Sequence, residues 1–202
     1  MNLKRWLYLF FSTLVIGAAS SLLLGLVLDT KLWEHGTPNV LVGIIGHVGL
    51  GILFSLIAQM GFFAYLAIHS FGLGLFRGLW SGVQSILIIF TFFDLVYFRY
   101  VNFAEGSSIL PFFGFPTGML VFALIIAYIK VKQTNNKAGV PTVFLIFVVS
   151  TIEWMPALHQ DQLLPLLNML IPILLCNAWQ VLQLHKLTVK TTQKPPNGRQ
   201  KA

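Results

Sequence analysis

Charged side chains are scarce in this chain. Asp, Glu, Lys and Arg make up only 9% of its 202 residues, whereas hydrophobic residues make up 56%. Because average soluble proteins carry about 25% charged residues, a water-soluble domain of this size is excluded. The mean hydropathy of +0.81 agrees. The high aliphatic and aromatic content also excludes an intrinsically disordered chain, so the composition predicts a membrane protein.

Cysteine is nearly absent, since Cys176 is the one thiol. A disulfide framework within the chain is therefore excluded, and a cysteine-based metal site is not expected. Cys176 lies in an apolar stretch, which predicts a small buried residue at a helix interface. The sequence also lacks GxSxG, Walker A and HExxH motifs. We therefore expect no catalytic residues, no metal and no cofactor.

Long apolar runs make up most of the chain. A membrane-spanning helix needs about 20 apolar residues, and the chain has continuous runs of that length. The first run is too long for a secretory signal peptide, so we interpret it as a retained helix. The sequence predicts an all-α polytopic membrane protein, with six transmembrane helices in a domain at 1–185 and a basic, disordered cytoplasmic tail at 186–202. The expected spans are 6–28, 39–68, 79–98, 110–129, 140–155 and 163–184.

The second run stays apolar to about Phe76, so it is either one long tilted helix or two short spans. With six spans and a cytoplasmic N-terminus, every Lys and Arg except Lys31 and Arg99 falls on the inner side. Splitting the run would place most of them outside. The positive-inside rule therefore favours six spans with both termini in the cytoplasm. The net charge of +7 then reflects orientation and contact with anionic lipids, and no nucleic-acid partner is expected.

Asp94 is a strong candidate for function, because an ionisable residue inside a membrane span is costly. On a helical wheel it lies within about 80° of Gln84 and Thr91, which predicts a polar stripe that faces the bundle. Such a stripe is typical of ligand or proton binding. Alternatively, Asp94 is a carboxylate at the membrane rim that pairs with Arg99 or with a neighbouring helix.

Two further ionisable residues are candidates for sensing a ligand or signal. Glu153 comes three residues before Pro156, at the outer end of the fifth span. It is interpreted either as a solvated helix end or as part of an outer pocket with Asp94. His47 lies near the middle of the second span, which favours a packed histidine with a hydrogen bond across a helix interface over a metal ligand. The outer-loop residues that remain are Glu34, His35, His159 and Asp161, and they lack the spacing of a metal site.

Small residues form two candidate contact faces. Gly17, Ser21 and Gly25 repeat every four residues in the first span, and Gly43 and Gly46 begin a glycine-rich stretch in the second. Small residues allow transmembrane helices to approach one another closely. Each face is therefore expected to pack either against another helix of this chain or against a partner protein.

Several stretches carry a family resemblance. The more specific ones are 54–69 with 71–77, and 93–100; the weaker ones are 152–156 and 176–180. With them, the whole chain resembles the KbaA family of KinB-signalling pathway activation proteins from spore-forming bacteria. The resemblance implies an integral protein of the bacterial plasma membrane that activates the sensor histidine kinase KinB at the start of sporulation, and so feeds a phosphorelay. It provides no catalytic residues that could be assigned to positions of this chain.

On this interpretation, the face at Gly17, Ser21 and Gly25 or the stretch from Gly43 to Gly51 would contact the kinase inside the membrane. The outer acidic and histidine residues would sense a ligand or pH, since histidine titrates near neutrality.

Two other classes of function stay open. One is the substrate-binding subunit of an energy-coupling-factor vitamin transporter, in which Asp94, Glu153 and His47 would line an outward pocket. The other is a small intramembrane enzyme, which would require a catalytic pair deep in the bundle.

Overall fold

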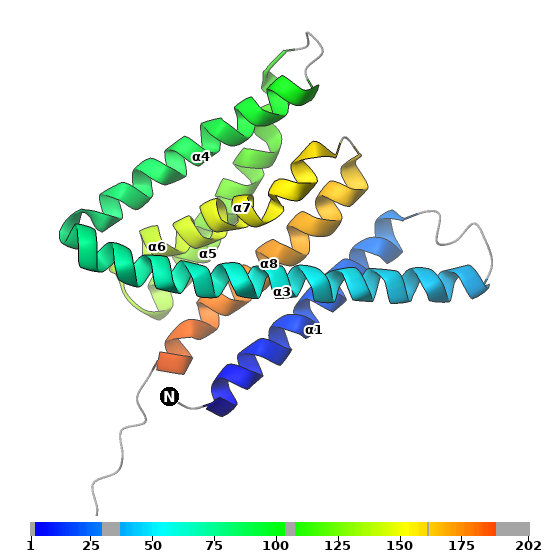
Figure 1. The fold of residues 1–202 in the computed structure, drawn as a ribbon, viewed down its shortest axis with the longest axis horizontal. Coiled ribbons are helices and arrows are strands. Elements are labelled where there is room, and N and C mark those ends of the chain that lie inside the picture. The colour runs from blue at the N-terminus through cyan, green and yellow to red at the C-terminus, as the bar shows by residue number, and fades with distance from the viewer. Residues whose placement is uncertain (1–2, 30–36, 104–107, 161, 189–202) are drawn as a thin grey trace, which may run out of the picture.

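A computed structural model of the chain describes residues 3–29, 37–103, 108–160 and 162–188. Every regular element in these residues is helical. The long helices are α1 (Leu3–Leu28), α3 (Thr37–Phe76), α4 (Trp80–Phe103), α5 (Gly114–Gln133) and α8 (Leu163–Thr188) (Figure 1). Five helical segments are long and apolar enough to cross a membrane, and one of them, Val40–Phe103, contains both α3 and α4. The fold agrees with the predicted class, an all-α membrane protein.

The second apolar run forms one helix. α3 is continuous over 40 residues, which rules out its division into two short helices, and it extends well beyond the expected span of 39–68. It ends at a short 3-10 turn, η1 (Arg77–Leu79), and α4 then runs back at an angle to α3 (Figure 1). Arg77 makes this turn with a positive φ of 48°, a conformation that favours glycine.

The segment before α8 is helical but irregular. Short 3-10 turns lie at η2 (Leu110–Phe113), before α5, and at η3 (Asn136–Ala138), after it. Then come α6 (Gly139–Val143), the π-helix η4 (Phe144–Val149), α7 (Ser150–Trp154) and the 3-10 turn η5 (Met155–His159). All six residues of η4 are buried. A π-turn winds more widely than an α-turn, so η4 decides which face of the segment presents Ser150 and Glu153.

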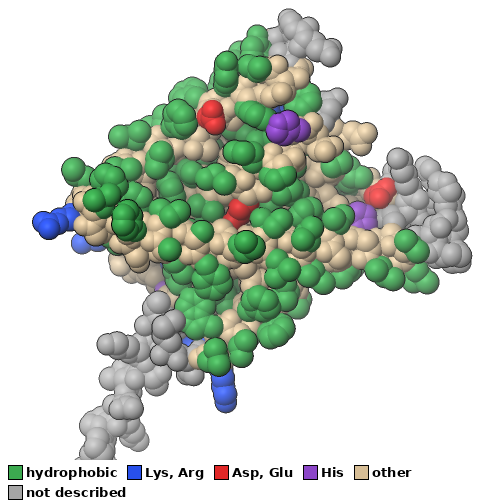
Figure 2. Space-filling view, in the orientation of Figure 1, with side chains coloured by type: hydrophobic (Ala, Val, Ile, Leu, Met, Phe, Trp, Pro, Cys, Tyr) green, Lys and Arg blue, Asp and Glu red, His purple; other side chains and the backbone are tan. Residues whose placement is uncertain are grey.

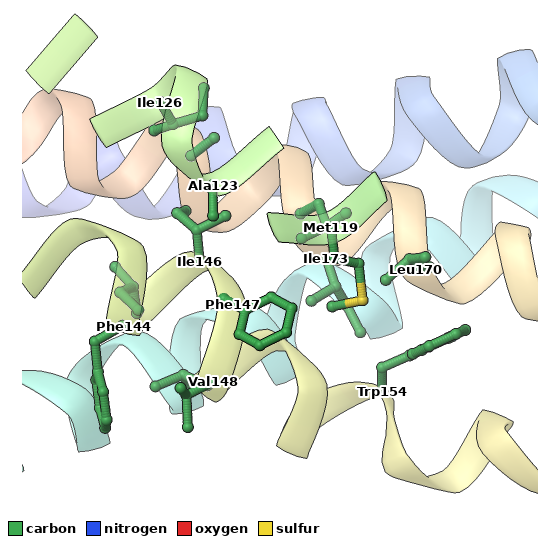
Figure 3. Packing of buried hydrophobic residues seen from close by; sticks show 14 of the residues in the cluster. Met119, Ala123, Ile126, Phe144, Ile146, Phe147, Val148, Trp154, Leu170 and Ile173 are labelled. Atoms are coloured by element: carbon green, nitrogen blue, oxygen red, sulfur yellow. The ribbon is translucent and has the colours of Figure 1, made fainter. Parts of the chain in front are cut away.

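The apolar core lies where η4 packs between its neighbours. Figure 3 shows Ile146 and Phe147 of η4 beside Met119 and Ala123 of α5 and beside Ile173 of α8. Trp154 is fully buried, and its Nε1 donates a hydrogen bond of 3.0 Å to the backbone oxygen of Leu166. This bond ties the end of α7 to α8, the helix at the centre of the bundle.

The outer surface is apolar as well. Hydrophobic side chains cover most of the face in Figure 2, and Lys and Arg lie at its edges. Ile45 and Leu79, for example, are 71% and 75% exposed. In water a continuous apolar surface drives association, whereas lipid tails solvate it. The surface therefore agrees with the membrane class.

The first turn of α1 and the last turn of α8 lie at the same end of the molecule (Figure 1). The C-terminal end of α5 reaches this region too, because Lys130 Nζ donates a hydrogen bond to the backbone oxygen of Val181. Lys130 is therefore a buried residue of α5, although the span expected from the sequence ends at residue 129. α8 continues to Thr188, and the predicted disordered tail otherwise lies outside the described residues.

Candidate functional site

Two asparagines of α8 each organise a buried polar cluster. Asn168 and Asn177 are nine residues apart, which places them on opposite sides of the helix, about 180° apart. Pro172 lies inside α8 between them. Because proline has no N–H, the backbone oxygen of Asn168 lacks its usual helical partner. The polar groups thus gather where α8 is already interrupted.

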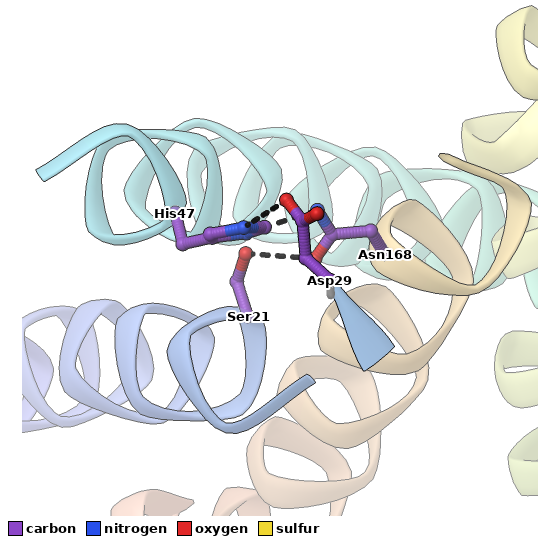
Figure 4. A network of polar contacts seen from close by, with 4 residues as sticks. All are labelled: Ser21, Asp29, His47 and Asn168. Carbon is purple, nitrogen blue, oxygen red and sulfur yellow. Dashed lines mark hydrogen bonds and ion pairs between the residues drawn. The ribbon is translucent and has the colours of Figure 1, made fainter. Parts of the chain in front are cut away.

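The first cluster, which we call the His47 cluster, contains Ser21, Asp29, His47 and Asn168 (Figure 4). His47 Nε2 lies 3.4 Å from Asp29 Oδ2, and Asn168 Nδ2 lies 3.3 Å from His47 Nδ1. Ser21 Oγ donates to Asn168 Oδ1 at 3.0 Å. A neutral imidazole protonated on Nε2 satisfies both ring contacts at once. The cluster therefore joins α1, α3 and α8 through side chains alone.

Gly25 makes room for this imidazole. A Cβ atom at Gly25 would collide with the ring of His47, so no larger residue fits there without moving α1 or α3. His47 itself is buried. The prediction of a packed histidine with a hydrogen bond across a helix interface is therefore confirmed.

The second cluster, the Glu153 cluster, contains Ser150, Glu153 and Asn177 and lies against Gly61 of α3. Ser150 and Glu153 share one face of α7 because they are three residues apart. Asn177 Nδ2 donates to Ser150 Oγ at 2.9 Å and to Glu153 Oε2 at 2.6 Å. Glu153 Oε1 has no hydrogen-bond partner and lies against Gly61, where a Cβ atom would collide with it.

Burial changes the interpretation of Glu153. Its side chain is only 8% exposed, so the interpretation as a solvated helix end is wrong. In the described part of the chain, no cation pairs with it. An ionised carboxylate without a cationic partner is costly in an apolar interior. The hydrogen bond from Asn177 is therefore the polar contact on which the Glu153 carboxyl group depends.

The structure does not bring Asp94 and Glu153 together. Asp94 is exposed on α4, whereas Glu153 points into the bundle. Gln84 is fully buried, and neither polar atom of its amide has a partner. Thr91 is half-buried. The predicted inward stripe is therefore wrong for Asp94, and the two carboxylates do not form an outer pocket.

Arg99 also differs from its expected place in an outer loop. It lies within α4, is buried, and donates to the backbone oxygens of Leu158 and Gln160 at 3.3 and 3.4 Å. Its guanidinium carbon lies 4.8 Å from the ring centre of Phe103 and 5.5 Å from that of Phe115. Arg99 thus fastens α4 to the turn after α7 and to α5.

The small-residue face of α1 packs within the chain. Gly17 meets Gly51 and Ser55 of α3 so closely that a Cβ atom would collide with both. Ser21 and Gly25 belong to the His47 cluster and its surroundings, so a partner helix has no access to this face. On α3, Gly43 is half-buried, whereas Gly46 faces open space.

Sequence reasoning missed the residues that hold the clusters together: Asp29, Ser150, Asn168 and Asn177. The available signal was a polar side chain inside an otherwise apolar run, together with the Ser150-x-x-Glu153 spacing. Cys176 is fully buried, and its thiol lies 3.6 Å from the backbone oxygen of Thr13 on α1. Its predicted place at a helix interface is confirmed.

The described residues include no group of three His, Cys, Asp or Glu side chains that could hold a metal ion. Of the outer-loop candidates, His159 packs edge-on against the ring of Phe98, with 5.2 Å between ring centres. Glu34, His35 and Asp161 lie outside the described residues.

Comparison with known proteins gives two matches. The family model KbaA, described as KinB-signalling pathway activation in sporulation, matches residues 13–187. A protein of Bacillus subtilis (strain 168), the KinB-signaling pathway activation protein, is 37% identical over 189 residues. The match covers 90% of this chain and 96% of the relative. No solved structure matches.

Proposed function

Because the chain belongs to the KbaA family, of KinB-signalling pathway activation in sporulation, we propose that it is an integral membrane protein that activates a KinB-type sensor histidine kinase. The observation that carries the proposal is the match to the Bacillus subtilis protein over nearly the full length of both chains. The matched range, 13–187, also includes every residue of the His47 and Glu153 clusters.

The proposed location is the bacterial plasma membrane, with six spans and both termini in the cytoplasm. The spans are α1, α3, α4, α5, the segment from α6 to α7, and α8. Two observations support this topology: α1 begins and α8 ends at the same end of the bundle, and Lys4 and Arg5 lie in the first turn of α1. Basic residues concentrate on the cytoplasmic side of membrane proteins.

Reporter fusions test this topology. We expect a cytoplasmic signal from reporters fused to the N-terminus and to the C-terminus, and an external signal from a reporter inserted between α4 and α5. Termini on opposite sides, or an internal reporter that stays cytoplasmic, would contradict the six-span arrangement.

The proposed activation works by contact between proteins in the membrane and includes no chemical step. The His47 cluster joins α1, α3 and α8, and the Glu153 cluster joins α3, α7 and α8. Both clusters therefore share α3 and α8. Contact with a kinase that shifts α8 would strain hydrogen bonds in both clusters, and a shift of α3 would strain those of His47 and change the contact between Gly61 and Glu153, so the bundle can pass a helix movement from one side to the other.

A genetic experiment tests the function. Deletion of the gene in its native bacterium should lower the phosphorylation of the KinB-type kinase and the spore yield. Deletion of the kinase gene should have the same effect, and the double deletion should show no further loss. Unchanged kinase phosphorylation in the single deletion would overturn the proposal.

Co-purification from mildly solubilised native membranes tests the proposed contact. Mass spectrometry should find the KinB-type kinase enriched with the chain, relative to an unrelated multi-span protein purified in the same way. Enrichment of a transporter's energising module without the kinase would instead favour a vitamin-binding subunit.

A further inference from the structure

One face of α4 has no partner in the described structure. Phe90 and Tyr97 on this face are 65% and 64% exposed, and Val101 is 61% exposed. The α4 face consists of Leu87, Phe90, Asp94, Tyr97 and Val101, all of them exposed. The steps between these residues alternate between three and four, which is the spacing with which one helix packs along another. The residues of the α4 face therefore lie along one side of the helix, where a second helix can contact them.

Asp94 sits in the middle of this face. The sequence predicts a span that ends at residue 98, but α4 continues to Phe103. Asp94 therefore lies nine residues before the end of the helix, or about 14 Å at 1.5 Å per residue. The hydrocarbon core of a bilayer is about 30 Å thick. If α4 spans the bilayer, Asp94 lies well inside the apolar layer and is not at its rim.

No group of the described chain compensates this carboxylate. Asp94 makes no hydrogen bond or ion pair with any described residue, and its neighbours along the α4 face are apolar or aromatic. Carboxylates inside a membrane are rare and are normally paired with a cation or placed in a polar cavity. Asp94 has neither within the part of the chain that the structure describes.

We propose that the α4 face binds a transmembrane helix of a partner protein that carries a Lys or Arg at the depth of Asp94. Charge complementarity favours this partner, because a Lys or Arg would neutralise the carboxylate of Asp94. A second copy of the chain, related by a two-fold axis, would place one Asp94 against the other, and like charges across a helix pair repel. The inference rests on the proposed function for the identity of the partner, the KinB-type kinase.

This surface differs from the one that the sequence suggests. Gly17, Ser21 and Gly25 are occupied by α3 and α8, so the small-residue face of α1 offers no contact area. The α4 face, by contrast, carries Phe90 and Tyr97, which are 65% and 64% exposed. Contact at α4 would also bear directly on Arg99, which connects α4 to the turn after α7.

Photo-crosslinking maps the contact. Phe90 and Tyr97 are each replaced with the photoreactive residue p-benzoylphenylalanine, a substitution that keeps an aromatic ring, in membranes that contain the KinB-type kinase. Tyr8 of α1 is the matched control because it is 62% exposed, close to the value for Tyr97. We expect at least a tenfold higher yield of the kinase crosslink at positions 90 and 97 than at position 8.

Charge substitutions at Asp94 test the chemistry. D94K should lower the crosslink yield from position 97 at least tenfold, and D94N should lower it less because an amide still forms a hydrogen bond. D94L should accumulate in the membrane at the same level as the unchanged chain or higher, because it removes a carboxylate from the lipid-facing surface. Exchange of the matching kinase Lys or Arg for Asp should restore the crosslink with D94K.

The outcomes separate this inference from the proposed function. Equal kinase crosslinks at positions 8, 90 and 97, or full kinase activation by D94L and D94K, would contradict binding of the kinase at the α4 face. Neither result would contradict the proposed activator function. A crosslink between two copies of the chain at position 97 would overturn the choice of occupant. If deletion of the chain leaves kinase phosphorylation unchanged, the proposed function itself fails.

Discussion

At the scale of single residues, two glycines decide where polar groups can enter the bundle. Gly25 admits the imidazole of His47, and Gly61 admits the carboxyl group of Glu153. In each case, a polar side chain from another element occupies the space that the glycine leaves on its helix. The polar clusters therefore depend on glycines that make no hydrogen bond through a side chain of their own.

The contact between Gly61 and Glu153 gives the first prediction. G61A should lower the free energy of unfolding in detergent by about 1–3 kcal/mol, because the new methyl group overpacks the site. E153A combined with G61A should recover part of that loss, because the colliding carboxyl group is removed. G46A is the control and should change the free energy little, since Gly46 faces open space. Strictly additive effects of G61A and E153A would contradict the contact.

Arg77 gives the second prediction. Its φ of 48° costs an L-residue about 1–2 kcal/mol relative to glycine. R77G and R77A both remove the charge, but only R77G relieves the backbone. We therefore expect R77G to have the higher melting temperature of the two, measured by thermal unfolding in the same detergent. Equal melting temperatures would show that the turn is not strained.

At the scale of helices, Gly17 and Gly51 allow α1 and α3 to cross in close contact. A Cβ atom at Gly51 would collide with the backbone of Gly17 and Ala18. Unlike a side chain, this backbone cannot avoid the collision by adopting another rotamer. Close packing of small residues is a main source of helix association in membranes, where the hydrophobic effect between helices is absent. The α1–α3 pair should therefore be sensitive to the size of residue 51.

The third prediction compares two glycines of α3. G51V should separate α1 from α3 and lower the free energy of unfolding by about 1–3 kcal/mol, as overpacking does elsewhere. G49V should have little effect, because Gly49 on the same helix has open space around it. Both variants change helix propensity in the same way, so unfolding in detergent isolates the crossing. Equal losses of unfolding free energy in G51V and G49V would show that residue 51 does not control the crossing of α1 and α3.

Helices were largely predictable from the sequence, whereas their irregularities were not. Apolar runs and proline positions indicate helices near the observed ones, because a chain in lipid must satisfy its backbone internally. The apolar run to Phe76 was visible in the sequence, but the π-helix at Phe144–Val149 left no such signal. The π-helix depends on tertiary packing, because η4 is wholly buried and its extra width is set by its neighbours.

At the scale of the whole molecule, the face of each helix was the hardest feature to predict. In a soluble protein the apolar side of a helix points inward, but here both the interior and the surroundings are apolar. The sequence therefore could not tell that Asp94 is exposed and that Glu153 is buried. His47 was predicted correctly because a neighbouring run of glycines indicated close packing.

In the residues that the structure describes, the molecule is accordingly a bundle with polar connections inside and with Asp94 on its outer surface. The buried clusters hold α1, α3, α7 and α8 together, and the α4 face is left for contact. This division explains how one small protein can be stable in itself and still present a recognisable charge to a partner helix.

Reconstitution in lipid vesicles is the most direct test of activation by contact in the membrane. The purified KinB-type kinase is placed in lipid vesicles with and without the purified chain, and its autophosphorylation rate is measured. An unrelated multi-span protein at the same density is the control. We expect a higher rate with the chain present than with the control. An unchanged rate in vesicles shown to contain both proteins in the correct orientation would contradict it.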